Sequence, residues 1–257
     1  MIPFFRKIRK TLADDNKSIK YFRYAIGEIV LVVIGILIAL SINNWNEQRK
    51  EFIQEKIFLK RFEVELNTNL ENILIAISLN KNRIHRAEFL LRTIDKPQLA
   101  VDSSSYFMKS IEHAGYTNIP LISDNAFEEL KSSGNLSLIS NEALRAALQK
   151  YYAWTSSEGQ YNFLQQDIQL NYSHLKQGIF TTSQVIDMGD YYINKNYSAI
   201  EAKETFERML NKPKFLEFIP YVIQNKLMAG NSYDDIYNQA KALIILLKAE
   251  LDKQNDD

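Results

Sequence analysis

The sequence predicts an all-α protein in which one N-terminal transmembrane helix continues into a helical bundle. Three observations carry this prediction. The 257 residues include only 8 Gly and 5 Pro, fewer than sandwiches and barrels need for their many turns. A long apolar run lies near the N-terminus. Residues 46–95 contain no Gly or Pro, and their apolar residues recur every seven positions, as in packed helices.

The composition excludes several classes of protein. Lys and Arg together number 31, Asp and Glu number 31, and the net charge is zero. A nucleic-acid binder should carry a basic excess, so we expect no nucleic-acid partner. Cysteine is absent, which excludes disulfides, thiol catalysis, cysteine zinc sites and lipid attachment through cysteine.

The apolar run has the length of a membrane span. Residues 24–45 read YAIGEIVLVVIGILIALSINNW. As a helix they would cover about 31 Å, close to the roughly 30 Å of a hydrocarbon core. Tyr21 and Tyr24 precede the run and Trp45 ends it, as in the aromatic belts of membrane proteins. Apolar residues surround the helix, whereas a buried amphipathic helix has one stripe. We therefore expect it to contact the lipid bilayer.

The charges beside this span predict its orientation. Residues 1–23 hold seven cations and two anions, so the positive-inside rule places the N-terminus in the cytoplasm. The remainder is then extracytoplasmic, which in a two-membrane bacterium means the periplasm. A cleaved signal peptide is the alternative, but the apolar run exceeds the usual 7–15 residues. We expect a single-pass, uncleaved anchor in the inner membrane.

The first twelve residues allow two interpretations. Apolar residues fall on one helical face beside four cations, which is typical of a helix lying on anionic lipid. The alternative is a plain basic flank that only sets topology. The apolar residues are Phe4, Phe5, Ile8 and Leu12.

Two segments resemble a known family. Residues 4–50, FFRKIRKTLADDNKSIKYFRYAIGEIVLVVIGILIALSINNWNEQRK, and residues 123–152, SDNAFEELKSSGNLSLISNEALRAALQKYY, are similar to an uncharacterised family of single-pass membrane proteins from Bacteroidota. That family is known only as a domain of unknown function. Its most distinctive features here are the Ala-Ile-Gly-Glu entry into the span and the Asn-Asn-Trp-Asn exit. The resemblance implies a membrane-anchored protein, and it implies no activity and no catalytic residue.

One face of the span is a candidate packing surface. It comprises Glu28, Gly35, Ala39 and Asn46. Gly35 and Ala39 form a small-xxx-small pair, which lets another helix approach closely. Glu28 is the only carboxylate in the apolar run, and it costs a few kcal/mol at mid-membrane but less near an interface. This face would pack on a second copy or on a membrane-protein partner. Alternatively, Glu28 only sets topology near the headgroups.

The repeat in residues 46–95 predicts a left-handed bundle or coiled coil. Its positions are Phe52, Leu59, Leu66, Ile73, Asn80, Ala87 and Ile94. Asn80 either sets the register of the packed helices or is an ordinary polar residue near a surface.

Turn residues divide the rest of the chain into further helices. Pro97 ends the first long helix, and Gly134 ends one that begins at Asp124 or Asn125. We expect a long helix over residues 140–176.

The C-terminal part has similar signals. Pro213 suits a helix start and Gly230 a helix end, while Ser232 with Asp235 resembles a capping box that opens the last helix. The expected organisation is a cytoplasmic tail (1–23), a transmembrane helix (24–45) and an extracytoplasmic helical domain (46–257).

No catalytic or metal-binding constellation is present in the sequence. His85, His113 and His174 lack the spacings of di-iron bundles and zinc proteases. There is no Gly-x-Ser-x-Gly elbow and no phosphate-binding glycine loop. We expect a protein that is not an enzyme and that has no catalytic, cofactor-binding or metal-binding residue.

An aromatic group is the candidate binding surface. It comprises Tyr151, Tyr152, Trp154, Tyr161 and Phe163. Aromatic residues with polar tips are enriched at interfaces and in ligand pockets. The alternative is that these rings fill the core of the bundle.

Two functions fit these observations. The first is a membrane-anchored, non-enzymatic periplasmic protein that serves as an interaction, scaffold or accessory subunit. The alternative is an extracytoplasmic, sensor-like module that binds a ligand. A ligand pocket should leave uncompensated polar groups lining a cavity near residues 151–172, whereas a scaffold should expose an apolar patch.

Overall fold

The computed structural model describes residues 18–156, 160–189 and 195–256. These residues form helices and no strand, so the all-α prediction is confirmed for them. Residues 1–17, with the apolar face at Phe4, Phe5, Ile8 and Leu12, lie outside the described residues. The helices in chain order are α2 (Ser18–Asp95), α3 (Gln98–Asp102), α4 (Ser104–His113), α5 (Asn125–Ser132), the 3₁₀ turn η1 (Leu136–Leu138), α6 (Glu142–Ser156), α7 (Gln160–Leu175), α8 (Thr182–Gly189), α9 (Ala199–Leu210) and α10 (Pro213–Asp256).

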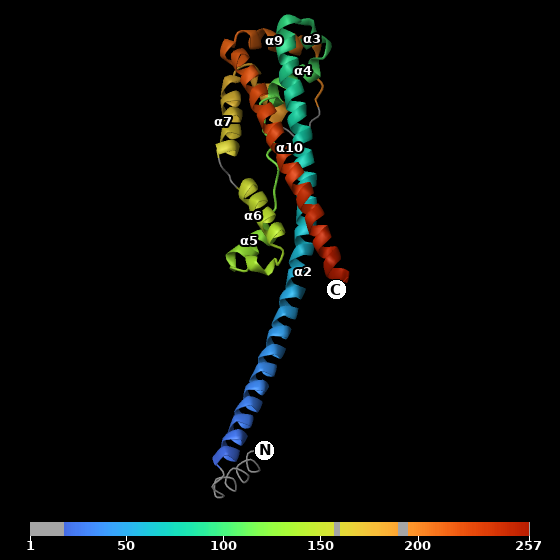
Figure 1. Ribbon diagram of the computed structural model, residues 1–257. Coiled ribbons are helices and arrows are strands. Elements are labelled where there is room, and N and C mark those ends of the chain that lie inside the picture. The colour runs from blue at the N-terminus through green and yellow to red at the C-terminus, as the bar shows by residue number, and fades with distance from the viewer. Residues whose placement is uncertain (1–17, 157–159, 190–194, 257) are drawn as a thin grey trace. The chain divides into compact units, whose positions relative to one another are not determined.

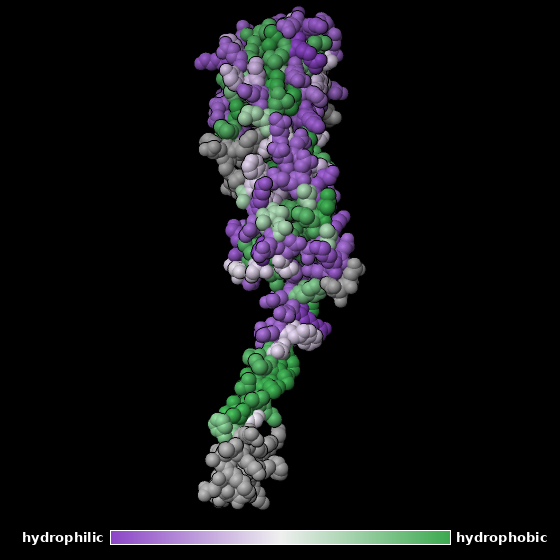
Figure 2. Space-filling model, in the orientation of Figure 1, coloured by the Kyte–Doolittle hydropathy of each residue, from purple (hydrophilic) through white to green (hydrophobic). Residues whose placement is uncertain are grey.

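The chain divides into two units after Ile57. The described part of the first unit is the beginning of α2. Every Ile, Leu and Val from Ile26 to Ile42 is at least 45 % exposed, and Figure 2 shows these residues as a continuous apolar surface. An 18-residue window of α2 has a mean hydropathy of 2.8, and none of it is buried. By length and composition this helix could cross a membrane.

The second unit is a helical bundle in which α2 and α10 lie side by side (Figure 1). The predicted seven-residue stripe of α2 faces into this bundle: Leu59, Leu66, Ile73 and Ala87 are fully buried, and Asn80 is 4 % exposed. The two outermost positions of the stripe, Phe52 and Ile94, are exposed. The stripe therefore marks the part of α2 that other helices cover.

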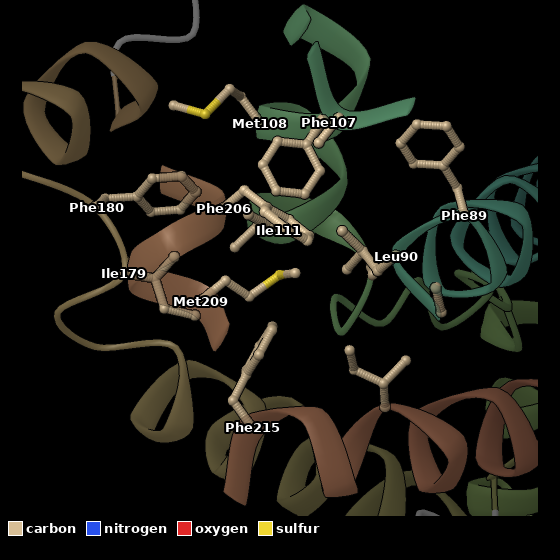
Figure 3. Packing of buried hydrophobic residues seen from close by; sticks show 14 of the residues in the cluster. Phe89, Leu90, Phe107, Met108, Ile111, Ile179, Phe180, Phe206, Met209 and Phe215 are labelled. Atoms are coloured by element: carbon tan, nitrogen blue, oxygen red, sulfur yellow. The ribbon is translucent and has the colours of Figure 1, made fainter. Parts of the chain in front are cut away.

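A large apolar cluster holds one end of the bundle together. Figure 3 shows it with side chains from several helices: Phe89 and Leu90 of α2, Phe107, Met108 and Ile111 of α4, Phe206 and Met209 of α9, and Phe215 of α10. Each large apolar side chain that is fully buried contributes about 1.5–3 kcal/mol. The short helices α4 and α9 are too short to be stable alone, and this burial stabilises them.

A second apolar cluster joins α5 and α6 to α2 and α10. The ring of Tyr152 stacks on Phe127, with 4.7 Å between centroids. Asp124 precedes α5, as predicted, but its side chain makes no capping hydrogen bond. Instead, Glu65 of α2 accepts a hydrogen bond from the backbone N–H of Ala126 (3.1 Å) and another from the Tyr152 hydroxyl (2.8 Å).

Several predicted boundaries are confirmed. α2 ends at Asp95, just before Pro97, and α10 begins at Pro213. Gly134 has a φ of 72° and follows the end of α5, where its backbone N–H donates to the carbonyl of Lys131. This left-handed conformation is accessible to glycine at little cost.

The prediction that Gly230 ends a helix is wrong. α10 continues through it from Pro213 to Asp256, and Ser232 and Asp235 lie inside the helix rather than at the start of a new one. A Cβ at Gly230 would lie 3.3 Å from Asn80 Nδ2. Glycine at this position lets α2 and α10 approach each other closely. Its low helix propensity does not end α10, because tertiary packing outweighs it.

The helix predicted over residues 140–176 corresponds to two described helices, α6 and α7. Residues 157–159, which lie between them in the sequence, are outside the described part of the chain.

Candidate functional site

The predicted packing face of the span lies in the first unit. Gly35, Ala39 and Asn46 are exposed, and Glu28 is partly exposed. A Cβ added at Gly35 would meet nothing within 4 Å. The described residues therefore leave this face open to lipid or to another helix.

The described members of the predicted aromatic group differ in their exposure. Tyr151 and Tyr152 are each 1 % exposed and belong to the apolar cluster with α5, and burial is the main cause that raises the pKa of each hydroxyl. Trp154 is 54 % exposed. Tyr161 and Phe163 belong to α7, but their side chains lie outside the described residues. The burial of Tyr151 and Tyr152 supports the interpretation in which these two rings fill the core of the bundle.

A different group of residues stands out in the second unit, where polar side chains separate two apolar clusters. On α2 these side chains lie between Ile77 of one cluster and Ala87 of the other, and on α10 between Ala229 and Val222. We call this group the polar layer and define it as Asn80 and Arg83 of α2, His113 of α4, Gln165 of α7 and Lys226 of α10.

Hydrogen bonds join the helices at and beside this layer. Asn80 Nδ2 donates to the backbone carbonyl of Lys226 over 2.7 Å, in a fully buried contact. The hydroxyl of Tyr233, which lies two turns from Lys226 on the same face of α10, donates to Gln165 Oε1 over 3.2 Å. These bonds place polar groups of α2, α7 and α10 in the interior.

Lys226 is the least expected member of the polar layer. Its side chain is 1 % exposed, and its Nζ has no hydrogen-bond partner. Burial, and then the positive charge of Arg83, lower the pKa of Lys226 from 10.5 to about 7. A buried ammonium without a counter-charge costs several kcal/mol, so this residue opposes folding wherever it is charged.

Further buried nitrogens of the second unit also lack partners. They are Arg83 Nε, Arg86 Nη1, His113 Nδ1 and Gln165 Nε2. Burial lowers the pKa of both guanidinium groups, and the charge of Arg86 lowers that of Arg83 further. Burial and the charge of Arg83 lower the pKa of His113 to about 4, so its imidazole is neutral at pH 7. Two amide oxygens, Asn118 Oδ1 and Asn225 Oδ1, lack a donor as well, and Asn225 directly precedes Lys226 on α10.

Aromatic rings hold both guanidinium groups in place. The Cζ of Arg83 lies 5.8 Å from the centre of the Tyr116 ring, and the Cζ of Arg86 lies 4.9 Å from that of Tyr106. Arg86 Nε also donates to Asn82 Oδ1 over 2.7 Å. Such cation–π contacts fix the planar fork of an arginine without neutralising its charge.

Among the described residues, Glu112 is the carboxylate whose charge acts on His113 of the polar layer. It forms an ion pair with Lys176, with 2.7 Å between Nζ and Oε2, and it also accepts a hydrogen bond from the Tyr116 hydroxyl. Burial and this hydrogen bond raise the pKa of Tyr116. Among the described residues, no other acid contributes to the pKa shifts of Arg83, Arg86, His113 or Lys226. Glu112 and Lys176 also line a hollow of about 280 Å³.

The unpaired nitrogens of the polar layer belong to lysine, arginine, histidine and glutamine side chains, which can hydrogen-bond to a ligand. Within the described ranges, no group of three or more His, Asp or Glu residues that could hold a metal ion is found.

Of this group, the sequence analysis identified only Asn80. A signal for Lys226 exists, because it occupies one position of an apolar stripe on α10 whose other members are Phe215, Ile219, Val222, Ala229 and Tyr233. The expectation that Gly230 ended the helix hid this stripe, since a broken helix would not carry one face past residue 230.

Comparison with known proteins provides a family but no function. The model of a family described as a family of unknown function matches residues 28–201. No curated protein and no solved structure matches the chain.

We predict that Lys226→Met stabilises the protein at neutral pH. The lysine has a pKa of about 7 when folded and 10.5 when unfolded. Its cost is therefore fully present below pH 7 and is lost as the pH rises toward 10.5. We expect the variant to raise the free energy of unfolding by about 1–4 kcal/mol at pH 6, with a smaller gain at pH 9.5, as measured by urea unfolding.

The matched control is Lys203→Met, which removes an exposed lysine of α9 and should change stability little. A Lys226→Met variant that is less stable than the wild type at every pH would show that the ammonium is favourably paired, contrary to this interpretation.

Proposed function

The chain belongs to this family, DUF6090, and we propose that it is a membrane-anchored, non-enzymatic module that binds a ligand inside its helical bundle. The observation that carries the proposal is the unpaired, buried Nζ of Lys226. Buried polar groups in proteins are nearly always hydrogen-bonded, and the exceptions often have a functional reason. Ligand binding is such a reason, because a buried group can lower the stability of the free protein and gain a hydrogen-bond partner from the ligand.

Several unpaired groups around Lys226 support the same function. Arg83, His113 and Gln165 come from three helices, and each has a buried nitrogen without a partner. A scaffold needs no such interior, because it acts through its surface. The sequence analysis expected such groups near residues 151–172, where Gln165 lies; the others come from α2, α4 and α10.

We further propose a topology for this module. The N-terminal tail (1–23) lies in the cytoplasm, the span (24–45) is an uncleaved, single-pass anchor in the inner membrane, and the helical domain (46–257) lies in the periplasm. The apolar, fully exposed helix in the first unit and the excess of five positive charges before it support this assignment.

A second candidate function is that of an accessory subunit that packs on another membrane protein or on its own copy. The observation that favours it is the open face at Gly35 and Ala39. A helix face with small residues allows close packing and interhelical contact in a bilayer. This function and ligand binding involve different units of the chain, so one protein can have both.

The proposed topology is tested by labelling single cysteines, since the chain has none of its own. We expect Asp252→Cys in α10 to react with a membrane-impermeant maleimide in intact spheroplasts. Lys10→Cys, before the span, should react only after lysis. Equal labelling of both after lysis is the control. If Asp252→Cys is protected and Lys10→Cys is labelled in intact spheroplasts, the orientation is the opposite of the proposed one.

Ligand binding is tested by thermal unfolding of the full chain in maltoside detergent with a panel of small anions, cations, zwitterions and sugars at constant ionic strength. Because a ligand stabilises the state that binds it, we expect at least one class to raise the Tm by about 5 °C near saturation. Lys203→Met should keep this response and Lys226→Met should lose it. A response that is absent, or that does not depend on Lys226, would count against the proposal.

Helix packing in the membrane is tested with Gly35→Leu. The larger side chain would hold a partner helix away, so we expect association in liposomes, measured by resonance energy transfer between labelled chains or by crosslinking to a partner, to fall at least threefold. Glu28→Gln should weaken it less. The matched control is Gly27→Leu, which enlarges a glycine about 80° away from Gly35 around the helix. Equal loss for both glycine variants would exclude a specific face.

A further inference from the structure

Four of the unpaired buried atoms are hydrogen-bond donors. Arg83 Nε, Arg86 Nη1 and Lys226 Nζ are donors that carry positive charge, and Gln165 Nε2 is a neutral donor. Cationic donors bind oxyanions more strongly than neutral donors do, because charge adds to the hydrogen bond. A cationic or metal ligand would be repelled by the same three charges.

The balance of charge indicates how much negative charge the interior lacks. Glu112 is already engaged by Lys176 and by the Tyr116 hydroxyl, so it is not a free counter-ion. Arg83, Arg86 and Lys226 thus have no carboxylate of their own among the described residues. When Lys226 is protonated, a ligand with a single negative charge would leave two of these charges uncompensated, and a dianion would leave one.

The donors are also held ready for such a ligand. The guanidinium groups of Arg83 and Arg86 lie against the rings of Tyr116 and Tyr106. The backbone at Lys226 is held by the amide of Asn80. A binding group that is already fixed loses little entropy when the ligand arrives. An arginine fork matches the geometry of phosphate oxygens, while a lysine supplies a point charge.

We propose that Lys226 and Arg83, with Arg86 one turn from Arg83 on α2, form an oxyanion site whose ligand carries a dianionic phosphate group. The assignment rests on the proposed function and names the chemical class of its ligand. Neutral His113, with an unpaired Nδ1, and the amide of Gln165 supply further hydrogen bonds to the phosphate or to the rest of the ligand that carries it. The phosphate belongs either to a soluble ion or ester or to the headgroup of a lipid, and the residues recognise the same oxygens in both.

The test is a titration of the full chain, in maltoside detergent that contains no phosphate, with sodium phosphate at constant ionic strength made up with sodium chloride. We expect saturable binding by calorimetry and a matching rise in Tm. Lys226→Met and Arg83→Gln should each weaken the affinity at least tenfold, and Lys203→Met should leave it unchanged. Lys226→Met is informative because it is expected to fold more stably than the wild type, so a lost response cannot be ascribed to unfolding.

Two outcomes overturn the proposal. One is that phosphate has no effect beyond that of chloride, and the other is that Lys226→Met binds phosphate as the wild type does. Binding of a neutral or zwitterionic compound in a Lys226-dependent manner, without phosphate binding, would refute the phosphate site but retain ligand binding as the function. Absence of Lys226-dependent binding for every compound would refute both.

Two further arms of the experiment distinguish the possible sources of the phosphate group. Glycerol 3-phosphate tests soluble esters, and short-chain phosphatidate added to the micelles tests a lipid headgroup, with diacylglycerol of the same chains as its control. A response of either arm that depends on Lys226 supports the site and assigns its source. A response to phosphatidate that persists in Lys226→Met would place lipid binding elsewhere and count against the site.

Discussion

The close approach of α2 and α10 determines the interior of the second unit. The two helices meet where the amide of Asn80 donates to the carbonyl of Lys226, and Gly230 leaves room for that amide. This contact sets the rotation of α10 about its axis. In the same rotation Phe215, Val222 and Ala229 are buried, and because Lys226 shares their face, its side chain enters the interior with them. The contact that allows the bundle to pack thus also places a cation inside it.

The polar layer is tolerated because apolar packing flanks it on both sides. One cluster contains Ile73 and Tyr233, and the other contains Leu90, Phe107 and Phe215. Burial of such side chains contributes several kcal/mol in total, comparable to the cost of an unpaired ammonium. The bundle can therefore hold polar groups at its middle without losing its fold, as expected where binding competes with stability.

The sequence predicted the features that depend on local chemistry. The helical class, the apolar span, the stripe on α2 and the boundaries at Pro97, Gly134 and Pro213 follow from periodicity and from residues with restricted backbones. It could not predict features that depend on partners distant in the chain. Gly230 has the local signature of a helix end, and only its contact with α2 explains why the helix continues. Lys226 reads as an interruption of an apolar stripe, and its meaning depends on which charges surround it.

The cap that α2 provides for α5 has a consequence for the order of folding. α5 has eight residues, too few for an isolated helix to persist in water. A backbone N–H at its start is satisfied by Glu65, which lies 61 residues earlier in the chain. The helix therefore gains its cap only after α2 has come alongside, and we expect α5 to be ordered late in folding. Its backbone amides are then a local reporter of bundle closure in hydrogen exchange, because they become protected only when that contact has formed.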